Sequence, residues 1–329
     1  MIVVTGGAGF IGSNLVAALA RRGTSKLVVC DRLAEGDPKA PNLAKHPEVR
    51  IVAPGDLLAF LDDEASAVEA VFHMGAVSST TVTDVDLVMA ENYDFSLALW
   101  RWCAARGVRL IYASSAATYG DGARGFDDDG SLDALARLKP LNLYGWSKHL
   151  FDQRVARLVA DGQGAPPQWV GLKFFNVYGP NEYHKGAMQS IVAKNHSRAS
   201  RGEAVTLFKS HHPNYADGGQ SRDFIAVSDC VAVMLWLLEN PQVSGLYNLG
   251  TGQARSFADL VGALFSAVGR EPNIEYVDTP EEIRANYQYF TEAPMERLRH
   301  AGYRAPFLSM EDGVGAYVRD FLDRNDPYQ

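Results

Sequence analysis

Three glycines near the start of the chain constrain its fold more than any other feature. They are Gly6, Gly9 and Gly12, and they follow the apolar run Ile2–Val4 and precede a helical pattern. Such glycines permit a tight strand-to-helix turn, close approach of the backbone to a pyrophosphate, and close packing of the helix on the strand. The helix then directs the positive end of its dipole at the phosphates. With the acid Asp31 about 20 residues on, the pattern predicts a dinucleotide-binding unit.

Further apolar runs predict the rest of the sheet. They are rich in Val, Ile and Leu without polar alternation, which is typical of parallel strands buried on both faces. The six predicted strands are Ile2–Val4, Leu27–Cys30, Val49–Val52, Ala70–His73, Leu110–Ser114 and Trp169–Phe174. Helical patterns lie between them at about Ser13–Arg22, Met89–Arg106 and Tyr144–Leu158. This alternation predicts an α/β fold with a doubly wound parallel Rossmann sheet.

The regular alternation of strands and helices ends after residue 175, which predicts a second, smaller unit. We expect a dinucleotide-binding Rossmann domain over residues 1–175, with about 222–250 returning to it. Residues 176–221 and 251–329 then form a smaller C-terminal α/β substrate domain. The elements expected in the later part are a helix ending near Arg201, strands at Val205–Phe208, Arg222–Ile225 and Tyr247–Leu249, and a helix at Ser228–Glu239.

Composition excludes several classes of protein. The chain has 329 residues, of which 47% are hydrophobic and 21% charged, with a net charge of −8. An acidic chain is not a general nucleic-acid binder. We find no apolar run near the length of a membrane span and no signal-peptide pattern, so we expect a cytoplasmic protein. The three widely spaced cysteines, Cys30, Cys103 and Cys230, predict no disulfide framework and no metal site.

The residues after the second predicted strand bear on the choice of cofactor. Asp31 can accept hydrogen bonds from the adenosine ribose, which alone favours NAD. Arg32 beside it can accommodate a 2′-phosphate, which favours NADP, and Lys39 can add to that charge. The fourth predicted strand ends in a rim of mostly small residues, Met74, Gly75 and Ala76, across which a cofactor can lie.

A candidate catalytic group follows in the predicted helix Tyr144–Leu158. Tyr144 and Lys148 stand at i and i+4, on one helix face. A tyrosine ordinarily ionises near pH 10, and a nearby lysine together with a positive nicotinamide favours the phenolate. Ser115, at the end of the fifth predicted strand, supplies a hydroxyl for the reacting alcohol or carbonyl oxygen. Together the three side chains predict hydride chemistry assisted by a tyrosine acid/base.

These motifs resemble those of extended short-chain dehydrogenase/reductases. Longer runs narrow the resemblance to the ADP-L-glycero-D-manno-heptose 6-epimerases. The runs are TGGAGFIGSN, YASSAATYG, PLNLYGWSKHLFD, FFNVYGPNEYHKGAM, RDFIAVSD and YNLGTG. The most discriminating segment is His184-Lys185-Gly186, because sugar 4-epimerases and dehydratases generally lack it.

The resemblance implies tightly held NADP, oxidation at C6 of an ADP-heptose, and reduction of the 6-keto intermediate from its other face. It implies Tyr144 as acid/base for one epimer and Lys185 for the other. The cofactor residues that it implies are Gly6, Gly9, Phe10, Ile11, Gly12, Asp31, Arg32, Lys39, Met74, Gly75, Ala76, Val77, Ser78, Asn92, Tyr144, Lys148, Val177 and Lys185. The implied substrate residues are Ser115, Asn176, Ala187, Lys194, Phe208, Arg222 and Tyr287, with Ala187 standing where other members carry serine. It also implies a homo-oligomer.

Two other interpretations stay open at this point. A UDP-hexose 4-epimerase or a nucleotide-sugar dehydratase would use the same scaffold, serine, tyrosine and lysine. A non-catalytic dinucleotide-binding module is a different class of protein, but such modules usually lose the tyrosine or the lysine, and both are present here.

Overall fold

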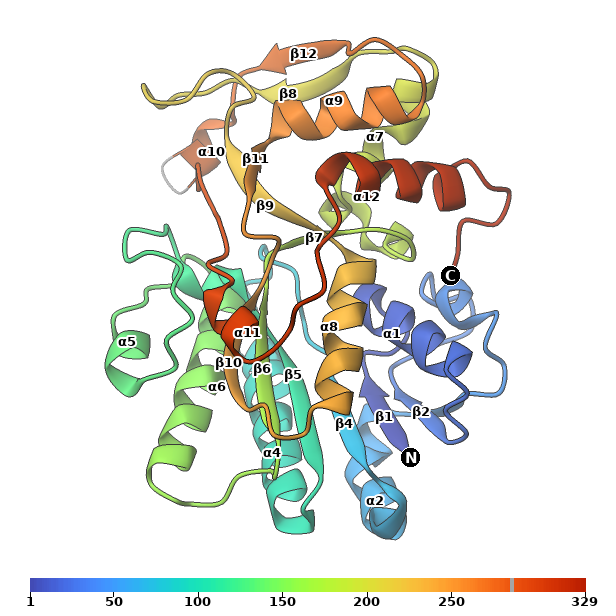
Figure 1. The fold of residues 1–329 in the computed structure, drawn as a ribbon, viewed down its shortest axis with the longest axis vertical. Coiled ribbons are helices and arrows are strands. Elements are labelled where there is room, and N and C mark those ends of the chain that lie inside the picture. The colour runs from blue at the N-terminus through green and yellow to red at the C-terminus, as the bar shows by residue number, and fades with distance from the viewer. Residues whose placement is uncertain (285–286) are drawn as a thin grey trace.

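The computed structural model describes residues 1–284 and 287–329, and its main feature is a seven-stranded parallel sheet (Figure 1). The strands are β1 (Ile2–Thr5), β2 (Leu27–Cys30), β3 (Arg50–Val52), β4 (Ala70–His73), β5 (Arg109–Ser115), β6 (Trp169–Phe174) and β10 (Gly245–Leu249). They lie in the order β10-β6-β5-β4-β1-β2-β3, with all neighbours parallel. The predicted doubly wound sheet is therefore confirmed. Its strand order reverses between β1 and β4, the place where ligands of such folds bind.

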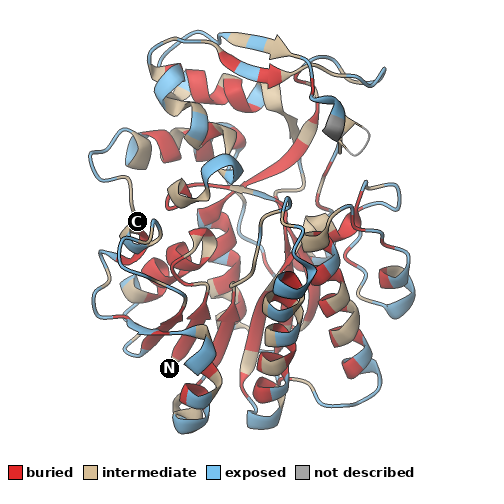
Figure 2. Cartoon of the chain, turned by 180° about the vertical axis from the view of Figure 1, so that it is seen from behind, coloured by how far each residue is buried: buried red, intermediate tan, exposed pale blue. Residues whose placement is uncertain are grey.

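Helices flank this sheet and bury it. They are α1 (Phe10–Arg21), α2 (Leu57–Asp63), α3 (Val85–Met89), α4 (Phe95–Arg106), α5 (Leu132–Ala136), α6 (Leu143–Ala160), α8 (Val227–Glu239) and α11 (Glu296–His300). Helix α1 packs against α8, and α6 packs against α3. Between them the strands other than the edge strand β3 have little exposed surface, as Figure 2 shows by colour, with Val3, Phe72 and Ile111 fully buried. Burial on both faces is the reason for their uninterrupted apolar sequence.

Two predicted helices differ from the observed ones in physically simple ways. Helix α1 begins at Phe10, three residues before the predicted start, because Gly9 already has the extended backbone of an N-cap residue. The predicted helix Met89–Arg106 starts earlier, at Val85, and is interrupted by a π-helical turn, η4 (Ala90–Asp94). Such π-turns are rare and often occur at functional sites.

A second group of elements lies beyond the carboxyl ends of the parallel strands (Figure 1). It contains a three-stranded sheet of β7 (Asn176–Tyr178), β9 (Ser221–Ala226) and β11 (Ala254–Ser256), and a pair formed by β8 (Val205–Phe208) and β12 (Ile274–Val277). Helices α7 (Ile191–Ser200), α9 (Phe257–Ala267), α10 (Glu281–Arg284) and α12 (Met310–Tyr317) accompany them. A separate apolar core, including Val192, Val205, Leu264 and Val314, holds this group together.

The chain passes between the two groups more than once. Of the stretch expected to return to the large sheet, β10 lies beside β6, whereas β9 pairs with β7 and β11. The C-terminal residues run back to α1, so both ends of the chain lie on the side of the large sheet (Figure 1). Across the described ranges, every helix is too short or insufficiently apolar to cross a lipid bilayer.

Candidate active site

A cavity of about 1320 Å³ opens where the parallel strands end. Thr5, Ser115 and Phe174 bring the ends of β1, β5 and β6 to its wall, and Phe208 and Arg222 close it from the second group of elements. Most small-molecule sites measure roughly 300–1,000 Å³. The cavity is therefore large enough for a dinucleotide and a second ligand side by side.

Nearly all of the predicted site residues line this single cavity. On the cofactor side they are Gly6, Gly9, Phe10, Ile11, Gly12, Asp31, Arg32, Lys39, Met74, Gly75, Ala76, Val77, Ser78, Tyr144, Lys148, Val177 and Lys185. On the substrate side they are Ser115, Asn176, Lys194, Phe208, Arg222 and Tyr287. Residues more than 200 positions apart in sequence are thus brought together at one sheet edge.

Two predicted residues, Asn92 and Ala187, stand outside the lining. Asn92 is fully buried on η4, where its amide accepts from Val77 N at 2.8 Å and donates to Val77 O at 2.9 Å. It also donates to Ser147 Oγ at 3.0 Å. Asn92 therefore fixes the cavity rim rather than facing the cavity. The carbonyl of Ala187 accepts from Lys194 Nζ at 3.3 Å.

The glycine-rich turn forms a cradle that admits no larger residue. Gly6 has a φ of +63°, and a Cβ there would lie 2.6 Å from the backbone of Gly75. A Cβ on Gly12 would lie 2.2 Å from the carbonyl oxygen of Gly6. Helix α1 then starts at the cavity without a side-chain cap, so its first N–H groups are free to bind phosphate oxygens. This arrangement fits the pyrophosphate of a dinucleotide.

The charged residues beyond β2 form a compact set of ion pairs. Asp31 accepts from Ala8 N at 2.9 Å and from Lys39 Nζ at 2.6 Å. Arg32 makes a two-pronged contact with Glu91, at 3.1 and 2.5 Å. Lys39 therefore partly neutralises the carboxylate that would repel a 2′-phosphate, and Glu91 occupies the guanidinium that would bind one.

Ser115, Tyr144 and Lys148 meet at the junction of β5 and α6. Asn142 caps α6 by accepting from Gly145 N at 2.8 Å, which fixes the first turn that carries Tyr144. Burial raises the pKa of Tyr144 in the protein alone, against a smaller lowering by the hydrogen bond with Ser115. Without a cofactor, desolvation of the phenolate dominates; the lowering expected from a positive nicotinamide concerns the cofactor-bound state and stays a prediction. Burial lowers the pKa of Lys148 to about 8, partly offset by the charge of Asp152.

A buried ion pair lies beneath this group. Asp152 accepts from Ser114 Oγ at 2.7 Å, from Tyr112 Oη at 3.0 Å and from Lys173 Nζ at 2.8 Å. Lys173 also donates to Thr118 Oγ1 at 2.8 Å. Both charged side chains are at most 1% exposed. The network ties α6 to β5 and β6 below the candidate catalytic residues.

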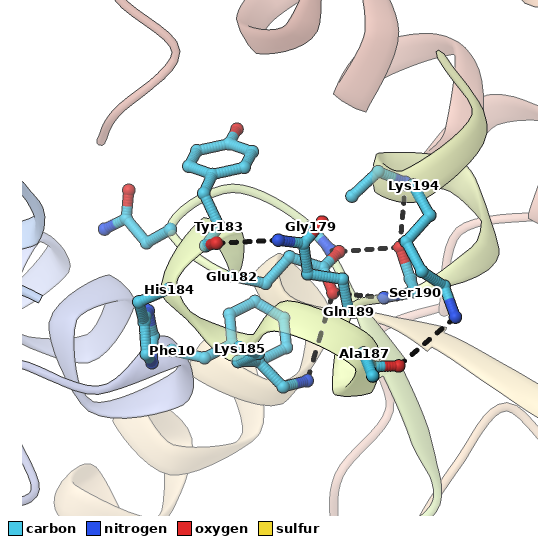
Figure 3. A network of polar contacts seen from close by, with 12 residues as sticks. Phe10, Gly179, Glu182, Tyr183, His184, Lys185, Ala187, Gln189, Ser190 and Lys194 are labelled. Atoms are coloured by element: carbon cyan, nitrogen blue, oxygen red, sulfur yellow. Dashed lines mark hydrogen bonds and ion pairs between the residues drawn. The ribbon is translucent and has the colours of Figure 1, made fainter. Parts of the chain in front are cut away.

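Lys185 reaches the cavity from a different kind of structure. It lies in η6 (Tyr183–Met188), a tight helical segment interrupted at Gly186, where φ is +52°. Its ammonium is 4.7 Å from the centroid of the Phe10 ring and 3.9 Å from Glu182 Oε2 (Figure 3). Burial lowers the pKa of Lys185 and Lys194 lowers it further, whereas Glu182 raises it.

The far end of the cavity carries an arginine among aromatic rings. The guanidinium carbon of Arg222 is 5.6 Å from the ring centroid of Phe257 and 5.8 Å from that of Tyr287. Arg222 also donates to the carbonyl oxygens of Ser221 and Gln288. A buried cation beside aromatic faces suits an anionic group attached to a planar ring.

The match to a known family decides what kind of protein this is. The family model described as "NAD dependent epimerase/dehydratase family" matches residues 2–250. The chain belongs to the NAD dependent epimerase/dehydratase family. Two curated members of this family cover the chain and themselves completely. They are the ADP-L-glycero-D-manno-heptose-6-epimerases of Nitratidesulfovibrio vulgaris strain DP4, 50% identical over 330 residues, and of Fusobacterium nucleatum, 43% identical over 336 residues. Within the epimerase/dehydratase family the chain thus groups with these heptose epimerases.

Solved structures of epimerases share the architecture. The ADP-L-glycero-D-manno-heptose-6-epimerase of Helicobacter pylori superposes with a TM-score of 0.79 at 29% identity, covering 97% of this chain and 95% of its own. The UDP-glucose 4-epimerase of Thermus thermophilus, in complex with NAD, gives 0.73 at 27% identity, covering 96% and 97%. The chain is therefore an epimerase of the NAD dependent epimerase/dehydratase family in fold and in overall sequence.

Lys173, Glu91 and Glu182 lie near predicted site residues, but they were not singled out from the sequence. Lys173 gave a signal, since a lysine in an otherwise apolar buried strand demands a charged partner. Glu91 gave none, because nothing local shows that it faces Arg32, and Glu182 gave only its spacing of three residues before Lys185. Glu91 and Glu182 contact the predicted site residues Arg32 and Lys185. Lys173 pairs with Asp152 on α6, the helix that carries Tyr144.

Proposed function

We propose that this chain epimerises ADP-D-glycero-D-manno-heptose at C6 to ADP-L-glycero-D-manno-heptose through a 6-keto intermediate, with NADP retained throughout. The observation that carries the proposal is the position of Lys185, which lines the same cavity as Tyr144 from a different part of the chain. The full-length relatives named as heptose epimerases support the choice of substrate.

Inversion at C6 requires two different acid/base groups, one that accepts the hydroxyl proton and one that donates a proton to the carbonyl oxygen. A nicotinamide cofactor, held at the glycine-rich turn of Gly6, Gly9 and Gly12, would supply the hydride chemistry at C6. Tyr144 takes the hydroxyl proton of one epimer, while Ser115 hydrogen-bonds the oxygen. Rotation by about half a turn about the C5–C6 bond turns the other carbonyl face to the cofactor and moves the oxygen across the cavity. Lys185 then donates a proton to that oxygen as the hydride returns, and exchange with solvent resets both groups.

Local positive charge supports an ADP-sugar as the second ligand. The chain carries a net charge of −8, which repels a diphosphate at long range. Lys185, Lys194 and Arg222 nevertheless line the cavity. Charge-assisted hydrogen bonds from such groups are the usual way to hold a diphosphate.

The choice of NADP over NAD rests on Arg32 and Lys39 beside Asp31, and it requires that a 2′-phosphate replace Glu91 as a partner of Arg32. Mass analysis of the dinucleotide released on denaturation tests this, and Arg32→Ala should weaken NADP binding while leaving NAD binding nearly unchanged. Release of NAD alone, with unchanged NADP affinity in Arg32→Ala, would contradict the assignment. We extend the proposal to a cytoplasmic homo-oligomer, on the strength of the resemblance to heptose epimerases.

The deciding experiment replaces Lys185. Lys185→Met should block epimerisation of ADP-heptose yet spare part of the dismutation of a 6-aldehyde analogue, which needs redox chemistry at one face only. Lys209→Met is the matched control, because Lys209 is an exposed lysine paired with Asp278. Epimerisation by Lys185→Met at the wild-type rate would refute the two-base scheme. Turnover of UDP-glucose in preference to ADP-heptose would instead favour a UDP-hexose 4-epimerase.

A further inference from the structure

Glu182 is a fully buried carboxylate beside the candidate acid/base Lys185 (Figure 3). Its Oε1 accepts from Ser190 Oγ at 2.7 Å, from Gly179 N at 3.3 Å and from Tyr317 Oη at 3.3 Å. Its Oε2 accepts from Ser190 N at 2.5 Å. A side chain held by donors alone is suited to the ionised, acceptor-only form of a carboxyl group. The carboxylate is therefore fixed in place by groups other than the lysine.

Lys185 faces this carboxylate without a hydrogen bond to it. The backbone N–H of Lys185 donates to Glu182 O at 3.0 Å, so the side chain starts one tight turn further along the chain. The ammonium then lies 3.9 Å from Glu182 Oε2 and over the Phe10 ring. Within residues 1–284 and 287–329, no side-chain or carbonyl acceptor forms a hydrogen bond with Lys185 Nζ. The ammonium is thus held by charge and ring contact, and its N–H groups stay available to a ligand.

Lys194 opposes the effect of Glu182 on the pKa of Lys185. Lys194, from α7, and His184, from η6, are its cationic or titratable neighbours, and Lys194 disfavours a second ammonium. Burial disfavours it as well. Glu182 supplies the compensating negative charge. Ser190 links the two sides, because its hydroxyl donates to Glu182 and accepts from Ala193 N at the start of α7, the helix that carries Lys194.

We propose that Glu182 is a positioning residue for Lys185: the charge of Glu182 holds the ammonium at the cavity wall and, after each proton transfer, favours reprotonation of the amine by solvent. The inference rests on the acid/base role proposed for Lys185. Glu182 moves no proton itself, because its oxygens are already occupied by four donors and lie beyond hydrogen-bond distance from Nζ. Without Glu182, burial and the charge of Lys194 would lower the pKa of Lys185 further, so its ammonium would lose the proton at a lower pH.

The test is a titration of Lys185 in the whole protein. NMR of lysine labelled with ¹³C at Cε, with the Lys185 signal assigned by its loss in Lys185→Met, reports the protonation state directly. Glu182→Gln should move the titration midpoint of Lys185 down by about one to three pH units, because an opposite charge at this distance is removed. The limb of the pH–rate profile that Lys185→Met abolishes should move by the same amount.

Ser190→Ala is the matched control, because it removes a donor from Glu182 but leaves both charges in place. Its midpoint should stay close to that of the wild type. An unchanged midpoint in Glu182→Gln, or an equal shift in Ser190→Ala, would overturn the inference. If Glu182→Gln does not fold, Glu182→Asp, which withdraws the carboxylate by one methylene, should give a smaller shift in the same direction, and an unchanged midpoint there counts against the inference.

The two proposals fail in different ways. A shifted NMR midpoint together with wild-type epimerisation in Lys185→Met would retain the Glu182–Lys185 coupling and refute the acid/base role. An unshifted midpoint in Glu182→Gln together with inactive Lys185→Met would refute the Glu182–Lys185 coupling and retain the acid/base role of Lys185.

Discussion

The two candidate acid/base groups face one cavity from supports of opposite kinds. Tyr144 and Lys148 project from α6, an 18-residue helix with a regular side-chain cap, so their relative position follows from helix geometry alone. Lys185 projects from η6, a six-residue segment broken at Gly186. No regular geometry fixes the direction of that side chain, and the surrounding contacts must do so.

Those contacts come from distant parts of the chain. Asn42 Nδ2 donates to the carbonyl oxygens of Ala8, at 2.8 Å, and Asn181, at 3.1 Å, which ties the η6 segment to the glycine-rich turn. The C-terminal residues hold the same segment, because Tyr183 Oη donates to Pro327 O and Gln329 N donates to Asn181 Oδ1. The helix side of the cavity has instead a buried ion pair, Asp152–Lys173, beneath it.

The contrast teaches that an ion pair beneath the helix holds one side of the cavity, whereas hydrogen bonds from distant segments hold the other. A buried ion pair is costly to break, whereas each neutral hydrogen bond that holds the loop segment contributes about 0.5–1.5 kcal/mol. We therefore expect substitutions on the helix side to affect chemistry or global stability strongly. Substitutions on the loop side should mainly change the protonation and placement of Lys185.

The largest effect should follow from Tyr144→Phe, which removes one oxygen from the helix side and keeps the ring. Turnover of at least one epimer should fall by about 10²–10⁴-fold, the usual contribution of general acid/base catalysis, with the cofactor still bound. Steady-state rates in both directions measure this. Trp146→Phe, an exposed aromatic on the same helix, should have little effect. A loss below about tenfold in both directions would exclude Tyr144 as an acid/base.

Removal of Lys173 tests the support beneath the helix side. Lys173→Met leaves the charge of Asp152 buried without its partner, and we expect the free energy of unfolding to fall by about 3–5 kcal/mol. Urea unfolding gives the value, with the exposed Lys209→Met as a control that should change it by less than about 1 kcal/mol. Equal effects of the two substitutions would mean that the buried pair does not stabilise this side of the cavity.

A smaller effect is expected from the pH dependence of stability through Lys148. Its pKa is lowered to about 8 in the folded protein from the ordinary 10.5, so the unfolded chain binds the extra proton between these values. Stability contributed through Lys148 must therefore rise with pH across this window, and the cost of the buried ammonium, about 3 kcal/mol, applies in full below pH 8.

The difference in unfolding free energy between the wild type and Lys148→Met, measured without cofactor, isolates this contribution. It should increase by about 3 kcal/mol in favour of the wild type from about pH 8 to 10.5. A difference that stays constant with pH would show that Lys148 keeps an ordinary pKa, and that water solvates its ammonium in the folded protein.

The sequence alone determined the fold and the helix side of the site. Strands buried on both faces must be apolar throughout, and the crowded turn at Gly6 and Gly12 excludes any Cβ, so both features are legible in the order of residues. The relative position of Tyr144 and Lys148 was also predictable, because residues four apart in a helix lie on the same face. The assignment of roles to these residues remains a prediction.

Only the tertiary structure decided which charges face one another. Glu91 stands opposite Arg32 and Asp152 opposite Lys173, although no local pattern indicates these two pairs, and Glu182 lies beside Lys185 through the tight turn of η6, in a segment predicted as a loop. The depth at which Tyr144 is buried, which raises its pKa in the protein alone, is likewise not stated by the sequence. Charge–charge interactions and desolvation depend on distance and depth in space, and a residue's position along the chain fixes neither until the chain has folded.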